Sequence, residues 1–240
     1  MSSFLPATDQ LELLRDAVEI VELTEPEAEI VSRYESLYTG AVNDVLREMC
    51  LLNQALPPGI APLRDEMVVA GFAFTIRSVC DPTIEGELAT RVEMLDKLTP
   101  NSVCVWNANG EDNASHWGGV MTRAAKKRGV RGAIIDGGIR DTRDILQLKF
   151  PVWTRYRTSN GALSRCKITG YQVPVLIGGV LIKPGDLVMA DIDGALVVPR
   201  SRVEEVLLRA EQVERNEIEI KSWVDAGMKA EEISERGGYF

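Results

Sequence analysis

The stretch from His116 to Asp141 constrains the fold more than any other, because it predicts three elements in close succession. Its sequence is HWGGVMTRAAKKRGVRGAIIDGGIRD. In order, it predicts an amphipathic helix over about 118–128, an apolar strand over about 131–136, a turn at Gly137-Gly138 and a helix over about 141–147. The start of the first helix and the end of the strand would then lie at corresponding ends of one helix–strand unit.

The rest of the chain alternates between helix-like and strand-like segments, and the strands gather in the second half. Expected helices cover about 9–22, 26–38, 39–49, 85–97 and 201–226, and expected strands cover about 67–77, 102–107, 150–157, 173–182 and 187–198. This order predicts an α/β sandwich with mixed strands rather than a strictly doubly wound parallel sheet.

Length and charge limit the classes of function. At 240 residues the chain suits one large domain, or one domain with terminal arms. Its formal net charge of −9 argues against a general nucleic-acid binder, because neutralising phosphates requires a basic surface. An anionic small-molecule substrate remains compatible, since a local arginine pocket can outweigh a distant negative surface.

Nothing in the sequence indicates secretion or a membrane span, and we expect a cytoplasmic protein. The segment MSSFLPATDQLELL lacks a basic region followed by an apolar core, and no uninterrupted run of about 18 apolar residues occurs. The cysteines are widely spaced, which favours reduced and mostly buried thiols over a disulfide or metal role. They are Cys50, Cys80, Cys104 and Cys166.

Arg140 and Asp141 follow the predicted strand and are the first candidates for chemistry. Arginine offers a planar fork that suits a carboxylate, and aspartate is a hard oxygen ligand for a divalent cation. The alternative is that Asp141 only caps the helix that begins after it, because aspartate is a preferred capping residue. Both interpretations are compatible with the residue pair alone.

The start of the preceding helix is a candidate anion site. Its first residues are Gly118, Gly119, Val120 and Met121. Backbone N–H groups in a first helical turn lack partners within the helix and carry partial positive charge, so they favour a carboxylate or an enolate oxygen. The alternative is a tight entry into the helix with no ligand.

His116 is the sole histidine and lies within a turn of Gly119. With an unperturbed pKa near 6.5 it could relay a proton, although a lone histidine is more often a packed or surface residue. Three other residues in the same loop compete for that role, and the sequence does not choose among them. They are Glu111, Asp112 and Asn113.

Two further segments suggest ion or phosphate binding but favour structural roles. Asp186, Asp191 and Asp193 lack the later glutamate and the flanking helices of a calcium loop, so we expect them at turns and strand ends. Gly178-Gly179 has no helix after it, which favours a hairpin over a phosphate loop.

Several motifs in this order resemble those of the class II pyruvate aldolases that act on 4-hydroxy-4-methyl-2-oxoglutarate and 4-carboxy-4-hydroxy-2-oxoadipate. The resemblance covers roughly residues 35 to 225. It lies in the segments YTGAVNDVL, PPGIAPLRDEMVVAGFAFTI, RGVRGAIIDGGIRD and VLIGGVLIKPGDLVMADIDGALVVP. Those aldolases share their fold with the RraA-type regulators of ribonuclease E. The resemblance therefore implies an RraA-like α-β-β-α sandwich with mixed sheets, usually assembled as homotrimers or homohexamers.

The resemblance also implies roles for the candidate residues. Asp141 would be the metal ligand, with Mg²⁺ expected and Mn²⁺ as the alternative, and Arg140 would hold the substrate carboxylate. The amides of Val120 and Met121, next to Gly118 and Gly119, would receive the pyruvyl carboxylate or enolate oxygen.

The chain departs from the family at one position and matches it weakly at another. The family normally has an acidic residue where this chain has Gly119, which puts cleavage of the usual aldol substrates in doubt. His116 is one candidate to replace that acid. Glu217 resembles a family glutamate that reaches a neighbouring subunit's active site, with Glu214 as the alternative, although a charged helical face is usually only solvated.

The sequence thus predicts a helical extension over residues 1–34, a catalytic domain over 35–225 and a tail over 226–240. The expected activity is that of a divalent-metal-dependent carbon–carbon lyase, releasing pyruvate by retro-aldol cleavage or decarboxylating oxaloacetate. The expected partners are a small anionic 2-oxo or hydroxy acid and further copies of the chain, with no nucleic acid and no membrane. The alternatives are a non-catalytic RraA-type regulator of a ribonuclease, or a sugar-acid lyase or dehydratase.

Overall fold

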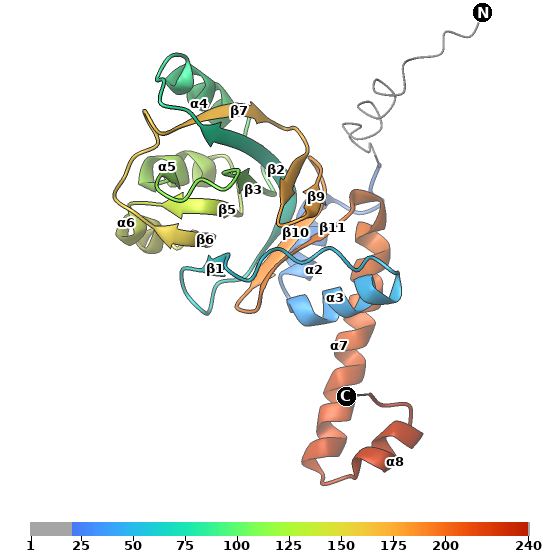
Figure 1. The fold of residues 1–240 in the computed structure, drawn as a ribbon. Helices are drawn as coiled ribbons and strands as arrows, with labels where there is room; N and C mark the ends of the chain where they lie inside the picture. Colours follow the sequence, from blue (N-terminus) through green and yellow to red (C-terminus); the bar gives the residue numbers. More distant parts are fainter. Residues whose placement is uncertain (1–20, 240) are drawn as a thin grey trace, which may run out of the picture.

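Residues 21–239 are described by a computed structural model, which is organised around a nine-stranded mixed sheet (Figure 1). The central strand is β3 (Ser102–Asn107), and all of its residues are buried. It pairs in parallel with β2 (Val69–Cys80) on one side and with β5 (Gly132–Ile139) on the other. Parallel strands that are covered on both faces contain apolar runs without alternation, as β3 does from Val103 to Trp106.

The remaining strands extend the sheet on both sides of this parallel centre, and the sheet is nearly closed. Its order is β1 (Ala61–Pro62), β6 (Val152–Arg157), β5, β3, β2, β10 (Leu187–Asp191) and β11 (Gly194–Val198). In addition, β4 (Ser115–Trp117) pairs in parallel with β5, and β7 (Cys166–Tyr171) pairs antiparallel with β2. A separate hairpin is formed by β8 (Val175–Ile177) and β9 (Val180–Ile182).

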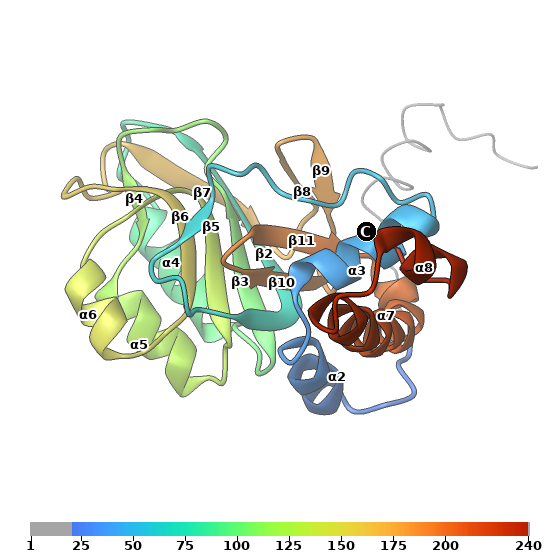
Figure 2. The same cartoon turned by 90° about the horizontal axis from the view of Figure 1, so that it is seen from below.

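Helices cover the sheet in two groups that lie apart in the molecule (Figures 1 and 2). The first group is α4 (Glu87–Asp96), α5 (Gly119–Lys127) and α6 (Thr142–Gln147). It packs on a core that includes Trp106, Trp117 and Phe150. The second group is α2 (Glu27–Tyr34), α3 (Thr39–Glu48) and α7 (Val203–Asp225). It encloses a separate core against β2, β10 and β11. The 3-10 turn η1 (Arg200–Arg202) leads directly into α7.

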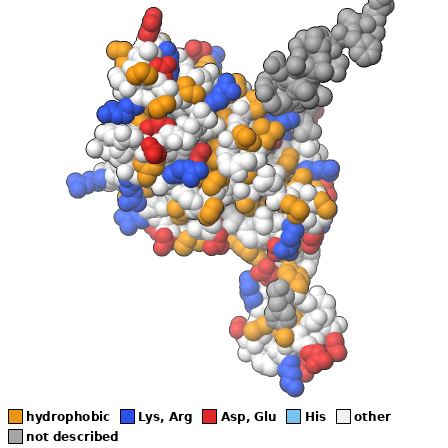
Figure 3. Space-filling model, viewed as in Figure 1, with side chains coloured by type: hydrophobic (Ala, Val, Ile, Leu, Met, Phe, Trp, Pro, Cys, Tyr) orange, Lys and Arg blue, Asp and Glu red, His pale blue; other side chains and the backbone are white. Residues whose placement is uncertain are grey.

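The C-terminal part of α7 projects from the body as an arm, and α8 (Ala230–Glu235) folds back on it (Figure 1). Ile220 and Ile233 are buried between the two helices. Ile218 and Val224 expose 64% and 48% of their surface, and Figure 3 shows the arm standing clear of the body. Within residues 21–239 no helix has both the length and the apolar character needed to cross a membrane.

The structure confirms the mixed α/β class and most expected elements. The strand at Ser102–Asn107 has the predicted bounds, and the helices expected at 39–49 and 85–97 differ by two residues or fewer at each end. The helix expected over 26–38 is shorter, at Glu27–Tyr34. The helix expected over 9–22 lies almost wholly outside the described residues. Strands β4 and β7 were not predicted.

The predicted turn at Gly137-Gly138 is wrong, because both residues lie inside β5. The surroundings of both glycines are crowded, and the strand does not turn at either residue. A Cβ on Gly137 would lie 2.9 Å from His116 Nδ1, and one on Gly138 would lie 2.6 Å from the backbone oxygen of Ala114. Glycine is needed here for the close approach of β4 to β5, and the strand therefore runs on to Ile139 before the chain turns.

The aspartates that suggested a calcium loop and the glycines that suggested a phosphate loop have structural roles, as predicted. Asp186 accepts hydrogen bonds from the backbone N–H groups of Lys183 and Arg200 at the β9–β10 connection. Gly178 and Gly179 form the β8–β9 hairpin, with φ values of 58° and 87°. The cysteines are all free thiols, but the prediction that they are mostly buried holds only for Cys104 and Cys166, since the other two are exposed.

Asp191 attaches α3 to the sheet, and we expect its loss to weaken the fold. Its carboxylate accepts hydrogen bonds from the Thr39 backbone N–H at 2.7 Å and the Thr39 hydroxyl at 2.8 Å. Asp191→Ala would leave both buried donors without acceptors and lower the free energy of unfolding by about 3 kcal/mol. Urea denaturation measures the change. Asp193→Ala, at an exposed position two residues away, is the control, and equal effects of both substitutions would contradict this role.

Candidate active site

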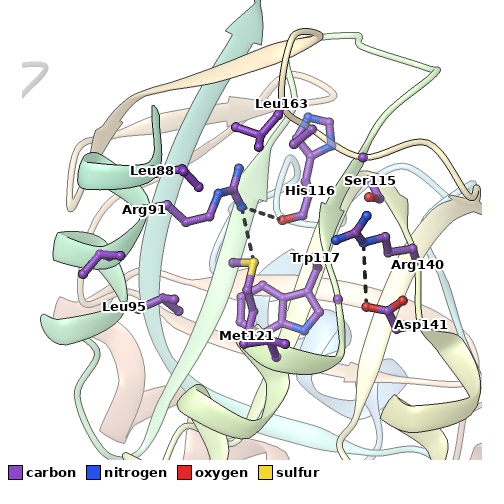
Figure 4. Close-up of a pocket in the computed structure, with 15 residues that line it drawn as sticks. Leu88, Arg91, Leu95, Ser115, His116, Trp117, Met121, Arg140, Asp141 and Leu163 are labelled. Atoms are coloured by element: carbon purple, nitrogen blue, oxygen red, sulfur yellow. Dashed lines mark hydrogen bonds and ion pairs between the residues drawn. The ribbon is translucent and has the colours of Figure 1, made fainter. Parts of the chain in front are cut away.

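The candidate site lies where two strand-to-helix connections meet at one edge of the sheet (Figure 4). Strand β4 leads directly into α5, and β5 leads into α6. Since β4 and β5 are parallel neighbours, both helices begin at the same edge. The Arg140 backbone N–H donates to the Trp117 carbonyl at 3.0 Å, which joins the two connections. Ligands commonly bind at the carboxyl ends of parallel strands, and the predicted residues lie at this edge.

Asp141 is the second residue after β5 and has a left-handed conformation, with φ 55° and ψ 33°. A non-glycine residue in this region costs of order 1–3 kcal/mol, so the surrounding structure must hold it there. It stands at the N-cap position of α6, but its side chain makes no capping hydrogen bond. Its Oδ2 instead accepts the Gly119 N–H at 3.1 Å. The capping alternative is therefore wrong, and the carboxylate faces the start of α5.

Arg140 and Asp141 both reach solvent, with side chains 50% and 45% exposed. The Arg140 Nε lies 3.7 Å from the Asp141 Oδ2, close enough for electrostatic attraction but too long for a hydrogen bond. The guanidinium has no shorter ion pair among the interactions of the described residues. Its donors therefore remain available to an incoming oxyanion, and the clamp role stays a prediction.

The close approach of α5 to this connection explains the two glycines at its start. A Cβ on Gly118 would lie 2.8 Å from Asp141 Oδ2. A Cβ on Gly119 would collide with Asp144 Oδ2, because the Asp144 carboxylate occupies the space above that glycine. Arg123, one turn into α5, forms an ion pair with Asp144. The space that a side chain at position 119 would need is thus filled by a carboxylate from α6.

The first turn of α5 presents its amides to the same region. The first hydrogen bond within the turn runs from the Thr122 N–H to the Gly118 carbonyl at 3.0 Å. The N–H groups of Gly119, Val120 and Met121 have no acceptor within the helix, and Asp141 takes that of Gly119. Val120 is 78% exposed. The amides of Val120 and Met121 are therefore available to an anion, which is the arrangement that the sequence predicted.

A cavity of about 460 Å³ opens beside these groups. Its lining includes Ser115, His116, Arg140 and Asp141 on the strand side. Apolar side chains and one further arginine from α4 and its surroundings complete the wall: Leu88, Arg91, Val92, Leu95, Met121 and Leu163. Among the described residues, Asp141 supplies the cavity's one carboxylate. The structure thus brings Gly118, Val120, Met121, Arg140, Asp141 and His116 together around one space.

His116 is more deeply buried than a surface relay would be. Its side chain is fully buried against the edge of Trp106, and neither ring nitrogen has a hydrogen-bond partner in residues 21–239. Burial lowers the pKa of His116 to about 4, against a smaller opposing effect of the Glu111 charge. The pKa thus lies well below the unperturbed 6.5 and the imidazole is neutral at neutral pH, while the proton-relay role stays a prediction.

Of the competing loop residues, Glu111 lies nearest to this histidine. Its Oε2 is 3.9 Å from His116 Nε2 and accepts hydrogen bonds from the Ala114 N–H and the Tyr156 hydroxyl. Asp112 and Asn113 line other depressions of the surface. Glu111 is thus held in place by its hydrogen bonds to Ala114 and Tyr156, and it does not line this cavity.

Glu217 is not brought to the cavity within one chain. It lies on α7, across the sheet from α5 and α6 (Figures 1 and 2), and its carboxylate accepts a hydrogen bond from Lys221 at 2.7 Å. Glu214 lies on the same helix. The role of either glutamate in a neighbouring subunit stays a prediction.

Arg91 was missed by the sequence reasoning, although its helix was predicted. Glu87 and Arg91 have the i, i+4 spacing of an ordinary surface ion pair. The same spacing places them in line with Met94 and Leu98, which are buried. The signal that could have identified Arg91 in the sequence is a charged pair on the apolar face of an amphipathic helix.

A family model matches most of the chain. The sequence model of the RraA-like family, described as Aldolase/RraA, matches residues 39–197. A relative from Halalkalibacterium halodurans, provisionally named 4-hydroxy-4-methyl-2-oxoglutarate aldolase, is 29% identical over 79% of this chain and 86% of that protein. Protein DlpA of Legionella pneumophila is 29% identical over 73% of this chain, and the match spans 29% of that longer protein.

Solved structures show the same fold. A protein from gut-associated microbes, described among novel cellulases, is 50% identical with a TM-score of 0.85, over 88% of this chain and 95% of that one. Streptomyces coelicolor RraAS2, described as an unusual member of the RNase ES inhibitor RraA family, is 30% identical with a TM-score of 0.70. That match covers 82% of this chain and 97% of RraAS2.

The buried His116 should make stability depend on pH. Its folded pKa of about 4 lies below the ordinary 6.5, so the unfolded chain takes up the proton first as pH falls. The contribution of the neutral, buried His116 to the free energy of unfolding is complete above pH 6.5 and is lost as the pH falls toward 4. Between pH 7 and pH 5 the free energy of unfolding should fall by about 2 kcal/mol. Urea denaturation of wild type and His116→Gln at both values measures it. Parallel losses in the two proteins would contradict the assignment.

Proposed function

This chain belongs to the RraA-like family, and from that premise we propose that it is a divalent-metal-dependent carbon–carbon lyase of 2-oxo or hydroxy acids. The observation that carries the proposal is the convergence of Arg140, Asp141 and the first turn of α5 on one cavity. An arginine fork and two unsatisfied amides suit a substrate carboxylate. An exposed carboxylate beside them suits a hard cation.

The residues present fit a cation held largely by its substrate. Asp141 directs a carboxylate toward the start of α5 without capping α6. No cluster of three or more potential metal-ligating side chains occurs in the described part of the chain. Magnesium is commonly bound by one or two carboxylates, with water and substrate oxygens completing its shell. Asp141 would hold the ion, and a bound Mg²⁺ or Mn²⁺ would supply positive charge for an enolate formed by the substrate.

The protein's own groups would bind and orient the substrate. The Arg140 guanidinium holds the 2-oxo acid end by its carboxylate, and the amides of Val120 and Met121 donate to oxygens of that end. The apolar wall of the cavity excludes water, which strengthens both interactions. Such a site stabilises the negative charge that develops on the 2-oxo group as a carbon–carbon bond breaks.

Decarboxylation places fewer demands on these residues than aldol cleavage does. Retro-aldol cleavage begins with removal of a hydroxyl proton, whereas loss of carbon dioxide from oxaloacetate requires no base. Position 119 is glycine, and the Asp144 carboxylate above it is held by Arg123. His116, with a pKa of about 4, is a weak base. These features favour oxaloacetate decarboxylation over retro-aldol release of pyruvate, with a sugar-acid lyase or dehydratase reaction as the next alternative.

The cavity does not favour the activity attributed to the cellulase-like relative. Glycoside hydrolysis ordinarily uses two carboxyl groups on either side of the scissile bond. Within residues 21–239 the cavity lining contains one, that of Asp141.

A second candidate function follows from the similarity to RraAS2, which is described as a member of a ribonuclease-inhibitor family. In that case the chain would bind a ribonuclease without catalysis. Strain and exposure at Asp141 favour the enzyme, because a binding surface has no need for a carboxylate in a left-handed conformation.

Asp141→Ala should abolish metal-dependent turnover. Pyruvate release from oxaloacetate with Mg²⁺ or Mn²⁺ is expected to fall about 100-fold or more, since the charge stabilisation would be lost. A chelator should have the same effect on the wild type. Asp193→Ala, remote and exposed, is the control. Absence of metal-dependent turnover of any 2-oxo acid by the wild type, together with binding of a ribonuclease, would favour the regulator.

Arg140→Ala should weaken substrate binding. Loss of a bidentate, charge-assisted pair corresponds to a rise in KM of about 30-fold or more, and Arg140→Lys should restore part of it as a point charge. Steady-state kinetics with oxaloacetate measure both variants. An unchanged KM in Arg140→Ala would show that another group holds the carboxylate.

A further inference from the structure

A second guanidinium faces the candidate site from the wall opposite Arg140. Arg91 comes from α4, whereas Arg140 comes from the end of β5, and both line the same cavity. Figure 4 shows the two side chains approaching the cavity from opposite sides. The Arg91 side chain is 15% exposed, so it is mostly buried but accessible from the cavity.

Arg91 is held rigidly from behind. Its Nε and Nη2 donate to Glu87 Oε1 at 3.2 Å and 2.5 Å, and the Glu87 side chain is fully buried. The other carboxylate oxygen of Glu87 accepts the Ile168 N–H at 2.8 Å. The guanidinium carbon also lies 5.4 Å from the centre of the Trp106 ring. A group fixed in this way loses little conformational entropy when it binds a ligand.

The cavity-facing nitrogen of Arg91 has weak acceptors. Its Nη1 donates to the His116 carbonyl and to the Met121 sulfur, each at 3.3 Å. A thioether is a poor acceptor, and 3.3 Å is long for a charged donor to a carbonyl oxygen. An oxyanion in the cavity would be a stronger acceptor than the sulfur, and Met121 is flexible enough to move aside.

The wall near Arg91 is apolar. Leu88, Val92 and Leu163 expose 60%, 59% and 43% of their surfaces around the cavity. The lining therefore has two guanidinium groups on opposite sides and hydrocarbon beside one of them. This distribution suits a ligand with an acidic group at each end and a short carbon chain between.

We propose that Arg91 is a second anion-binding residue, which selects 2-oxo acids with a further carboxylate at the end distant from Arg140. The inference rests on the proposed function for the position of the 2-oxo acid end. Glu87 acts as the positioning residue, because it fixes the guanidinium and balances its charge when the cavity is empty. The distal carboxylate binds Nη1 in place of the Met121 sulfur. Because a guanidinium stabilises an ionised carboxylate, this role applies to acids that keep the distal carboxylate, as 2-oxoglutarate does, and not to the carboxylate that oxaloacetate loses.

Calorimetric titration in Mg²⁺ with three matched acids tests the proposal. The probes are 2-oxoglutarate, 2-oxopentanoate, which has a methyl group in place of the distal carboxylate, and glutarate, which lacks the oxo group. The wild type should bind 2-oxoglutarate at least about tenfold more tightly than 2-oxopentanoate. Arg91→Met should remove that preference by weakening 2-oxoglutarate binding about 10- to 100-fold, while the Kd of 2-oxopentanoate stays unchanged.

Further variants separate recognition from folding. Arg91→Met leaves the buried Glu87 unpaired, so the double variant Glu87→Gln with Arg91→Met is titrated alongside it, and thermal melting checks both folds. Arg91→Lys should recover part of the preference. Arg128→Met removes an arginine that pairs with Asp96 on the surface, and it should bind all three acids as the wild type does.

The outcomes distinguish this proposal from the proposed function. Equal affinities of wild type for 2-oxoglutarate and 2-oxopentanoate overturn the role of Arg91 and leave the lyase proposal standing. Equal losses for both acids in the folded double variant also overturn it, since they indicate a structural role. Arg91-dependent binding of glutarate without turnover of any 2-oxo acid supports Arg91 and overturns the lyase. Absence of binding by all three acids overturns both.

Discussion

The hydrogen bond from the Gly119 N–H to the Asp141 carboxylate fixes the candidate site. It joins the start of α5 to the end of β5 and helps to hold Asp141 in its left-handed conformation. The approach is close enough that neither Gly118 nor Gly119 has space for a side chain without movement of a neighbour. Arg140 and the available amides of α5 owe their relative positions to this junction.

Much of the fold and part of the site follow from the sequence. Apolar runs such as Ser102–Asn107 identify buried parallel strands, and the order of elements places Arg140 and Asp141 at a strand end. Gly137 and Gly138 were misassigned because glycine permits both turns and crowded strands. Only the distance between β4 and β5, which is a tertiary property, decides between the two.

The electrostatic properties of the site could not be predicted either, because they also depend on tertiary contacts. The pKa of His116 depends on burial beside Trp106, and the sequence carries no signal of that contact. Arg91 was not identified from the sequence, because its spacing from Glu87 one turn earlier is that of an ordinary surface ion pair. The depth of α4 in the core determines that this pair borders a cavity instead.

The Asp144 carboxylate above Gly119 couples two positions in different helices. An acidic residue cannot be installed at 119 while Asp144 retains its place against Arg123. Conversely, shortening residue 144 alone would leave Arg123 without its counterion. A side chain at 119 therefore requires the Asp144 carboxylate to turn away from its present place and to leave Arg123. The two helices are thus coupled at this junction, since a substitution at 119 or at 144 changes the contacts of the other position.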